Sequence, residues 1–447
     1  MRSLRVYMDR RPLGELFEGD DLWQLQYDPD WVSAADGFAL APGLPLRLER
    51  HVDGGTQRPV QWYFDNLLPE ELLRQAIEKE AGIKGDDAFA LLQYLGAESA
   101  GSLTLLPPDV PLPATTGLRV LSDAELTHRI AGIPKQTLTA QAPKRMSLAG
   151  AQHKMLVSLV GGKLYEPEGA TASTHILKPS HPDASTYPAS VMNEYLTMCM
   201  ARAMDLPVPA AHLRHVPEPV YVVDRFDRLV REVGTRDQGV PSLEVQRLHI
   251  IDACQLLSRS RAFKHSGATL DSLKDIIRAT SNRARTTLQL FRWLIFNLLI
   301  ANDDCHLKNL SFFVSSHGIQ LAPHYDLLAT GAYHTRAFAD EHAIWPDVPM
   351  AIPLPGARTF GQVTEDSVLL AGEALGLSAP TARRVLGEMV ALADAALATA
   401  QAALDQAHAG PADVTGLSTA SEVRFMRALT HIVVKDMKDR LTRRRAT

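Results

Sequence analysis

The sequence predicts an α+β protein in which strands come first and helices fill the C-terminal half. The 447 residues exceed what one ordinary core accommodates, so we expect at least two domains. Short β-branched and aromatic segments bounded by Gly and Pro recur up to about residue 228. From about residue 244 helical spacing dominates, with an Ala-rich stretch at Ala391–Ala409 and an amphipathic helix from about Thr419 to Arg440.

Residues 1–106 are expected to form a small N-terminal subdomain of mixed α/β structure. It opens with a candidate strand at Leu4–Met8, and a helix is expected after the segment Phe64–Glu70. Residues 107–118 follow as a linker, because the proline-dense run Leu106–Pro113 can form neither a helix nor an interior strand.

Residues 119–228 are expected to form a sheet with one helix. Met155–Val160 ends in two glycines and Lys163–Tyr165 resumes, which indicates a β-hairpin. A third strand at Thr174–Lys178, a helix at Ala189–Ala203 and a strand at Val220–Val223 follow. Residues 229–447 are expected to form a helical lobe.

The composition is that of a folded chain, with 46% apolar and 22% charged residues. Its formal net charge of −5 argues against nucleic-acid binding over the whole surface. A local basic end remains at Lys435, Lys438, Arg440 and Arg443–Arg445. Any contact with DNA is therefore expected to be local or through a partner protein.

The N-terminus and the cysteines both favour the cytoplasm. Met1–Arg10 alternates charged and apolar residues and has no apolar core of a signal peptide. The three cysteines have neither the even number of a disulfide framework nor the spacing of a zinc site. The most apolar run, Phe291–Ala301, contains Arg292 and is far shorter than the roughly 20 residues of a membrane span. We expect a cytoplasmic protein with no membrane partner, and a buried helix at this run.

A loop of small residues before the hairpin is a candidate phosphate-binding loop, since backbone amides approach phosphates closely where side chains are small. It has neither a Walker A pattern nor the glycine pattern of a kinase loop, and on its own such a segment is more often an ordinary turn. The candidate residues are Ala149, Gly150, Ala151, Gln152, His153 and Lys154.

Lys178 lies at the end of a strand, and Glu194 lies on the helix that follows. In protein kinases a strand lysine held by a helix glutamate points at the α- and β-phosphates of ATP. The alternative is a solvated lysine and an unrelated surface glutamate.

Asp224, Arg225 and Phe226 follow a short β-branched strand, where a kinase-like fold has its adenine-binding hinge. Backbone groups of Asp224 and Phe226 would pair with the adenine edge. The alternative is a turn with a surface network of Arg and Asp.

The most informative segment is the loop from Asp304 to Asn309, followed downstream by Asp326. Asp304 would orient or deprotonate an acceptor hydroxyl, whereas the amide oxygen of Asn309 and the carboxylate of Asp326 would hold Mg²⁺ on a nucleotide. A histidine in such a loop is more often structural, and a lysine can equally face solvent. The candidate ATP contacts here are His306, Lys308, Asn309, Tyr325 and Asp326.

Together these motifs resemble the HipA-type serine/threonine kinases, which are toxins of bacterial toxin–antitoxin pairs. The resemblance runs through Phe64–Pro69, Ser147–Lys154, Asn193–Glu194, the Asp304 loop and Tyr325–Asp326. It implies a protein-kinase/lipid-kinase-like bilobal fold, with the N-terminal subdomain packed on an N-lobe and a helical C-lobe carrying the catalytic and metal-binding loops.

Position by position, the resemblance implies that Asp304 is the catalytic base and that Asn309 and Asp326 bind Mg²⁺. The nucleotide would be ATP, held by the phosphate loop, the strand lysine and the hinge named above. Ser147 matches the family's autophosphorylated serine, whose modification is associated with an ejected phosphate loop and a silenced kinase.

The resemblance also implies partners: an aminoacyl-tRNA synthetase as substrate, a helix-turn-helix antitoxin similar to HipB, and operator DNA through that complex. The chain departs from the commonest pattern at Cys305 and His153, neither of which is a metal ligand. Two other functions stay open. One is a corepressor with a vestigial kinase site, suggested by the basic C-terminal end, and the other is a small-molecule phosphotransferase, which has a related spacing from Asp to Asn.

Overall fold

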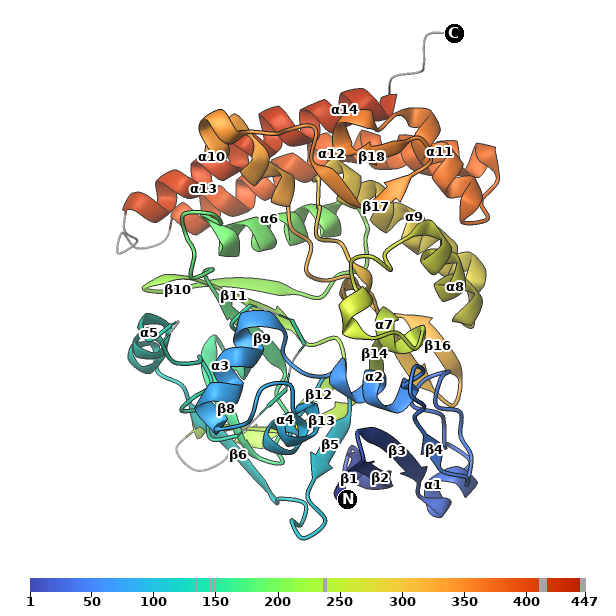
Figure 1. Ribbon diagram of the computed structural model, residues 1–447. Coiled ribbons are helices and arrows are strands. Elements are labelled where there is room, and N and C mark those ends of the chain that lie inside the picture. Colours follow the sequence, from blue (N-terminus) through green and yellow to red (C-terminus); the bar gives the residue numbers. More distant parts are fainter. Residues whose placement is uncertain are drawn as a thin grey trace. The chain divides into compact units, whose positions relative to one another are not determined.

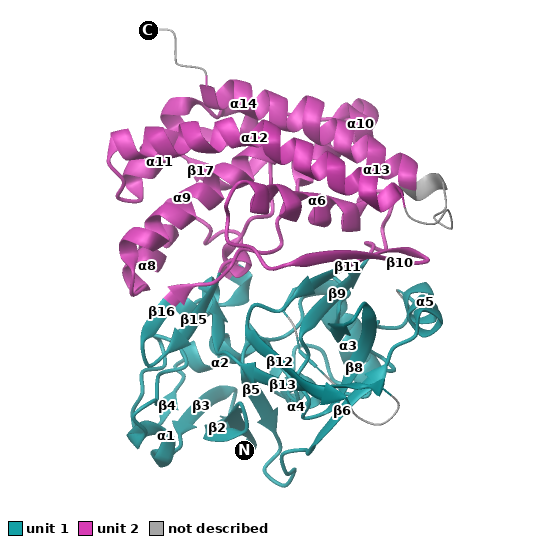
Figure 2. Cartoon of the chain, turned by 180° about the vertical axis from the view of Figure 1, so that it is seen from behind, with its two compact units in different colours: residues 1–179, 222–262, 311–319 teal, residues 180–221, 263–310, 320–447 magenta. Residues whose placement is uncertain are grey.

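The computed structural model describes residues 1–133, 135–144, 146–147, 149–150, 152–235, 239–409 and 416–442. The chain divides into two compact units (Figure 2). Unit 1 comprises Met1–Pro179, Val222–Ala262 and Ser311–Ile319, and unit 2 comprises Ser180–Tyr221, Phe263–Leu310 and Gln320–Thr447. Strands make up most of the regular structure of unit 1 and helices most of that of unit 2, so the α+β class is confirmed.

Unit 1 opens with a five-stranded sheet in the order β4-β3-β2-β1-β5 (Figure 1). Its strands are β1 (Arg2–Met8), β2 (Arg11–Gly19), β3 (Leu22–Tyr27), β4 (His51–Val52) and β5 (Leu103–Leu106); the helices between them are α1 (Pro29–Ser33), α2 (Pro59–Asp65), α3 (Glu71–Ala81) and α4 (Ala88–Leu95). Strands β1 and β2 are antiparallel, with Leu4 opposite Leu16, and both leucines are buried. The expected first strand and the helix expected after Glu70 are thus confirmed.

Five further strands of unit 1 are joined in the order β11-β9-β7-β8-β6. These elements are β6 (Thr115–Val120), α5 (Asp123–Ala131), β7 (Met155–Val160), β8 (Lys163–Gly169), β9 (His175–Pro179) and the end of β11 (Glu218–Asp224). The predicted hairpin is confirmed: Val160 pairs with Lys163 around Gly161 and Gly162, whose φ angles of +53° and +75° are those of a tight turn that favours glycine.

One part of the expected linker forms a strand instead. β6 begins at Thr115 and pairs with β8, opposite Gly169. The ladder to β8 satisfies backbone groups that a solvated linker would expose, so residues 115–118 belong to the sheet.

The remaining strands of unit 1 were not expected from the sequence. They are β12 (Arg228–Thr235), β13 (Pro241–Arg247), β14 (Ile250–Asp252), β15 (Ser311–Ser315) and β16 (Gly318–Leu321), with the short helices α7 (Ala253–Leu256) and η2 (Arg261–Phe263). β12 and β13 form an exposed antiparallel ribbon, whereas β14 and β15 pair with Ile251 opposite Phe312, both buried.

Unit 2 consists mainly of helices (Figure 1). Its elements are α6 (Ser190–Ala203), β10 (Ala211–Val216), α8 (Leu270–Ala279), α9 (Arg283–Leu299), η3 (Leu307–Asn309), η4 (Thr330–His334), α10 (Arg336–Ala339), η5 (Asp340–His342), β17 (Pro349–Leu354), β18 (Ala357–Thr359), η6 (Phe360–Gln362), α11 (Glu365–Ala374), α12 (Ala379–His408), α13 (Gly416–Ala428), η7 (Leu429–Val434) and α14 (Lys435–Thr442). The Ala-rich helix is confirmed as part of α12, and the expected last helix is α13 to α14 with one π-helical stretch at η7.

Two helices hold the centre of unit 2. α9 carries the apolar run predicted to be buried, and Phe291, Ile295 and Leu299 are fully inaccessible to solvent. α12 packs on α6, α9 and α11, where small side chains such as Ala393 and Ala400 allow close approach. α12 is also the one described helix long and apolar enough to cross a membrane by length and composition. One face of it, which includes Ala393 and Leu397, is buried in this unit.

Candidate active site

The loop that begins the candidate site is shaped by Asn302, directly after α9. Ala301 adopts a left-handed conformation with φ +51°, which ends the helix and turns the chain. The buried Asn302 side chain donates to Asn297 Oδ1 at 2.8 Å and accepts from the Asp304 amide at 3.0 Å. Sequence reasoning missed this residue, although an Asn after a helix that carries another buried Asn was a usable signal.

Asp304 combines a fixed backbone with an open side chain. Its carbonyl oxygen accepts from the His306 amide at 2.9 Å and from Asn309 Nδ2 at 3.0 Å. Its carboxylate remains 51% exposed, so a macromolecular hydroxyl can reach it. The five-residue spacing has a physical meaning, because Asn309 uses its NH₂ to hold the loop and retains its amide oxygen as a possible metal ligand.

Asp326 is positioned by the start of α6. It has a left-handed φ of +56°, and the segment after it is tied to α6 by a 2.8 Å bond from the Ala329 amide to Asn193 Oδ1. Burial raises the pKa of Tyr221 well above its usual range, and the charges of Glu194 and Asp326 raise it further. The carboxylates of Glu194 and Asp326 therefore both raise the pKa of the buried Tyr221 hydroxyl. The bond from Ala329 to Asn193 ties the segment after Asp326, the expected metal ligand, to α6.

The residues that flank these carboxylates are mostly buried. Lys308 is buried and its carbonyl accepts from Tyr325 Oη at 2.7 Å, which excludes the solvent-facing alternative for this lysine. His306 is buried as well. His324 stacks on Trp293 with 6.1 Å between ring centroids, and burial lowers its pKa to about 3, so it is a neutral structural residue.

In unit 1, the expected phosphate loop requires glycine at one position. Gly150 has φ +107°, and a Cβ there would lie 2.7 Å from Lys154 Nζ, which donates to the Ala149 carbonyl at 2.6 Å. The Glu70 amide donates to the Gly150 carbonyl at 3.2 Å. Ala151 lies outside the described residues.

The segment Phe64–Glu70 and the phosphate loop, which the sequence presents as separate motifs, are in contact. Ser147 is buried, and its hydroxyl donates to the Leu67 carbonyl at 2.6 Å. Its amide donates to the Glu98 carbonyl at 2.7 Å. Ser147 is therefore held by backbone acceptors on both sides.

Sequence reasoning also missed Glu98, which is completely buried at the centre of an ion cluster. Its carboxylate lies 2.8 Å from Lys144 Nζ, 3.3 Å from the Arg225 guanidinium and 3.0 Å from that of Arg228. Burial by itself raises the pKa of Glu98, but the charges of Lys144, Arg228 and Arg225 outweigh burial and hold it well below its usual range.

The expected hinge has a structural side chain at its centre. Arg225 is buried and pairs with Asp227 at 2.7 Å. The alternative of an Arg–Asp network is therefore confirmed, but the network is buried and does not lie on the surface. The Arg225 amide donates to the Thr174 carbonyl at 2.9 Å. Asp224 itself pairs with His175 at 3.0 Å.

Lys178 is buried within β9, which excludes a solvated lysine. Its expected partner Glu194 is also buried, but in α6 of unit 2. The pairing of the two residues stays a prediction.

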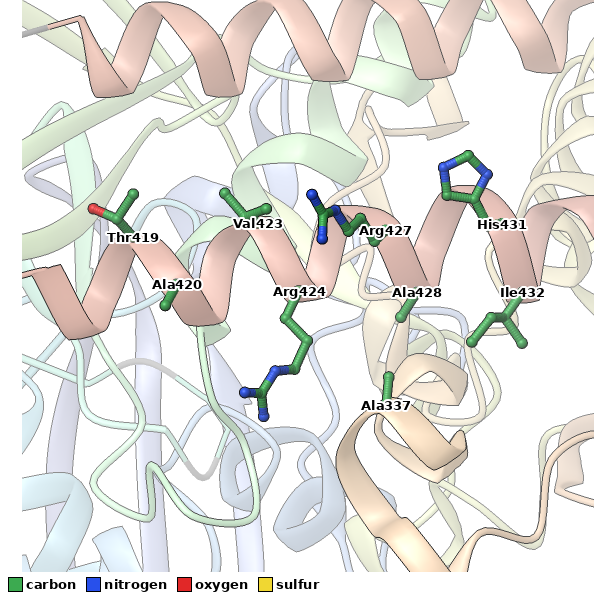
Figure 3. A pocket seen from close by; sticks show the side chains of 9 residues that line it. All are labelled: Ala337, Thr419, Ala420, Val423, Arg424, Arg427, Ala428, His431 and Ile432. Atoms are coloured by element: carbon green, nitrogen blue, oxygen red, sulfur yellow. The ribbon is translucent and has the colours of Figure 1, made fainter.

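A groove of about 740 Å³ lies elsewhere, along α13 and η7 of unit 2 (Figure 3). Among the described residues, none of the predicted site residues lines it. Its lining residues are Ala337, Thr419, Ala420, Val423, Arg424, Arg427, Ala428, His431 and Ile432.

Comparison with known proteins identifies two family domains. Residues 4–106 match the HipA N-terminal domain, and residues 146–397 match the HipA-like C-terminal domain. The chain is 32% identical to the putative kinase Y4mE of Sinorhizobium fredii, over 87% of this chain and 90% of that protein. It is 30% identical to the serine/threonine-protein kinase toxin HipA of Shewanella oneidensis, over 74% of this chain and 76% of that protein.

The fold also matches a solved structure. It superposes with a TM-score of 0.74 on a chain of the Shewanella oneidensis complex of HipA, HipB and its operator DNA, at 23% identity and over 98% of this chain and 99% of that one. The chain therefore shares the fold of that chain, which agrees with the α+β class expected from the sequence.

Proposed function

Because the chain belongs to the HipA family, we propose that it is the serine/threonine protein kinase toxin of a type II toxin–antitoxin pair. The observation that carries the proposal is the loop in which Asn309 Nδ2 holds the Asp304 carbonyl at 3.0 Å and leaves the Asp304 carboxylate open.

Asp304 is the proposed base. Its carboxylate would accept the proton of a serine or threonine hydroxyl as that oxygen attacks the γ-phosphorus of ATP, while the bond from the γ-phosphorus to the β–γ bridging oxygen breaks and ADP leaves. Asn309 and Asp326 offer amide and carboxylate oxygens, which are the hard ligands that Mg²⁺ prefers, so this donor set fits the metal. Mg²⁺ bound there would neutralise charge on the nucleotide phosphates. The buried Lys308 adds a positive charge beside Asn309.

ATP is proposed to bind through residues of the phosphate loop, Lys178 and the hinge. The small side chain of Ala149 and the left-handed φ of Gly150 suit the backbone at these two residues to a close approach by phosphate oxygens. Lys178 supplies a buried ammonium for the same charge. The backbone of Asp224 and Phe226 would pair with adenine, because the side chain of Arg225 is already paired with Asp227.

A direct test compares phosphate transfer from labelled ATP by the wild type and by Asp304→Ala. Removing a general base costs roughly 10²- to 10⁴-fold in rate, so we expect transfer to itself or to lysate proteins to fall by that factor. The matched control is Asp275→Ala on the surface of α8, which should keep full activity. Equal labelling by the wild type and Asp304→Ala would refute the proposal that Asp304 is the base of a kinase.

We further propose that autophosphorylation of Ser147 silences the kinase. The Ser147 hydroxyl is buried and bonded to the Leu67 carbonyl, so a phosphate dianion cannot be accommodated in this conformation of the loop. Phosphorylation would therefore require the loop to leave its contacts with Leu67 and Glu98. Intact mass after incubation with ATP and Mg²⁺ should show a phosphate in the wild type and none in Ser147→Ala. A phosphate that persists in Ser147→Ala argues against this switch.

The partners are proposed from the family: an aminoacyl-tRNA synthetase as substrate and a helix-turn-helix antitoxin similar to HipB, with operator DNA through that complex. The structural relative from Shewanella oneidensis is a complex of HipA with HipB and operator DNA, which supports the antitoxin and the DNA. Phosphoproteomics after induced expression, comparing the wild type with Asp326→Ala, would identify the substrate.

The basic C-terminal end gives the corepressor alternative less support than the sequence suggested. Within the described part of the basic end, Lys438 pairs with Asp394, and Arg440 pairs with Asp436 at 3.1 Å. These carboxylates offset charge that DNA binding would use. Arg443–Arg445 lie outside the described residues. Gel shifts of operator DNA with antitoxin, with and without this chain, decide this point, and unchanged affinity would exclude corepression.

A further inference from the structure

Two histidines flank the carboxylate of Asp304. His265 Nδ1 lies 3.9 Å from Asp304 Oδ1, and the rings of His265 and His306 are 4.7 Å apart between centroids, at 80° to each other. One ligand atom from each of the three side chains can be chosen so that all lie within 4.8 Å of one another. None of the roles assigned above to the catalytic loop involves His265.

The backbone fixes this grouping. The Leu307 amide donates to the Lys264 carbonyl at 3.1 Å, which ties the segment before α8 to the catalytic loop. The His306 amide donates to the Asp304 carbonyl, so the two residues form one tight turn. His306 is buried, whereas the side chains of His265 and Asp304 are 55% and 51% exposed to solvent.

The dimensions suit a small transition-metal ion. Bonds of about 2.0–2.2 Å to tetrahedral Zn²⁺ place ligand atoms about 3.3–3.6 Å apart. The gaps of up to 4.8 Å must therefore shrink by little more than 1 Å, which rotation of the two exposed side chains supplies. Two imidazoles and one carboxylate leave a fourth position open, as in zinc sites with three protein ligands.

The donor set also selects against Mg²⁺, which prefers six oxygen ligands, whereas imidazole suits Zn²⁺ and its neighbours in the transition series. Cys305 lies between two of these ligands in the sequence and does not join them. It is buried, and its thiol donates to the Asn302 carbonyl at 3.4 Å.

We propose that His265, Asp304 and His306 form a Zn²⁺-binding site at the catalytic loop. The ion occupies the carboxylate that would otherwise accept the proton of the acceptor hydroxyl. Zn²⁺ therefore inhibits phosphoryl transfer reversibly in the presence of excess Mg²⁺. Binding follows from the geometry alone, whereas inhibition rests on the proposed kinase function.

The binding test uses the metal-free full-length protein, titrated with Zn²⁺ against a chromophoric chelator and with Co²⁺ as a spectroscopic substitute. We expect the wild type to bind one more equivalent than His265→Ala, and to show the intense visible absorption of low-coordinate Co²⁺. Loss of an outer-shell partner alone weakens metal sites about 10- to 100-fold, so loss of a ligand should weaken this one by at least that factor. The exposed side chain of His265 makes its removal compatible with folding.

The matched control is His342→Ala, another exposed histidine of unit 2, which should bind Zn²⁺ as the wild type does. Other sites, such as the pair of His175 with Asp224, persist in every variant, so the difference between variants isolates the proposed site. Equal stoichiometry and affinity in the wild type and His265→Ala would overturn the proposal.

A kinase assay distinguishes Zn²⁺ binding at this site from inhibition of phosphoryl transfer by the bound ion. Each variant's transfer rate is measured against Zn²⁺ concentration and compared with its own rate without Zn²⁺. We expect at least about a tenfold higher half-inhibitory concentration for His265→Ala than for the wild type and His342→Ala. Zn²⁺ binding at this site without inhibition would overturn the regulatory half. A protein that binds Zn²⁺ here but never transfers phosphate would refute the proposed function and leave the metal site standing.

Discussion

The ion cluster around Glu98 allows a stringent test of how buried charges stabilise unit 1. The substitution Glu98→Gln keeps the shape of the side chain and removes its charge. In the wild type, this carboxylate lies 2.8 Å from Lys144 Nζ and 3.0 Å from the Arg228 guanidinium, and all three side chains are buried. Arg225 and Arg228 keep a second carboxylate in Asp227, so the ammonium of Lys144 is left without a counter-charge.

The expected cost is large, because removing one partner of a buried ion pair costs about 3–5 kcal/mol. Each kcal/mol lowers Tm by roughly 2–4 °C for a unit of this size, so the Tm of unit 1 should fall by roughly 6–20 °C. The control is Glu244→Gln, which removes a pair with Arg231 whose side chains are 61% and 74% exposed. An exposed pair contributes under about 1 kcal/mol, so this control should melt close to the wild type.

The dependence on pH follows from the lowered pKa of Glu98. A carboxylate whose folded pKa lies below its unfolded value of about 4.3 stabilises the fold above that pH, and the stability is lost as the pH falls through the folded pKa. The difference between the wild type and Glu98→Gln should therefore be constant from about pH 5 to 8 and decrease only in acid.

Thermal and urea unfolding, followed by circular dichroism, measures these differences. The double variant Glu98→Gln/Lys144→Met should recover part of the loss, because it removes the stranded ammonium as well. If the free energy of unfolding of Glu98→Gln at pH 7 lies within about 1 kcal/mol of the wild-type value, the reasoning is refuted, because removing one partner of a buried ion pair should destabilise the fold by more than that.

Two further substitutions test the loops. Gly150→Ala places a side chain at a backbone φ of +107° and against Lys154 Nζ. The resulting strain of about 1–3 kcal/mol should weaken ATP binding, measured by calorimetry, by about tenfold or more. The control Gly387→Ala, where α12 leaves open space for the new side chain, should bind ATP as the wild type does. Equal ATP affinity in both glycine variants would show that the loop does not bind phosphates in this conformation. Asn302→Ala removes both bonds that shape the turn into Asp304 and should lower kcat about 10- to 100-fold with little change in KM, whereas an unchanged kcat would exclude its positioning role.

Local contacts explain which features could be predicted. The hairpin at β7 and β8 turns on two adjacent glycines, and the bond between Asn309 and Asp304 spans five residues, so both are visible as short motifs. β12 was missed because both of its faces are exposed beyond its first residue and its apolar residues show no alternation. Glu98 was missed because its partners Lys144 and Arg228 lie 46 and 130 residues away, and a lone Glu ordinarily indicates a solvated surface.

The contact between Phe64–Glu70 and the phosphate loop shows why a motif can be recognised without its role being readable. Leu67 and Glu70 each contribute a backbone atom: the Leu67 carbonyl accepts from the Ser147 hydroxyl, and the Glu70 amide donates to the Gly150 carbonyl. The side chain of Asn66 makes this possible, because its Nδ2 donates to the Trp62 carbonyl at 2.7 Å and to the Arg259 carbonyl at 3.0 Å, which fixes the turn after α2. A phosphate on Ser147 would remove the bond to Leu67 directly, whereas the bond to Gly150 depends on the loop staying in place. The bond between Ser147 and Leu67 therefore requires an unmodified hydroxyl on Ser147, which is the contact that the proposed switch would break.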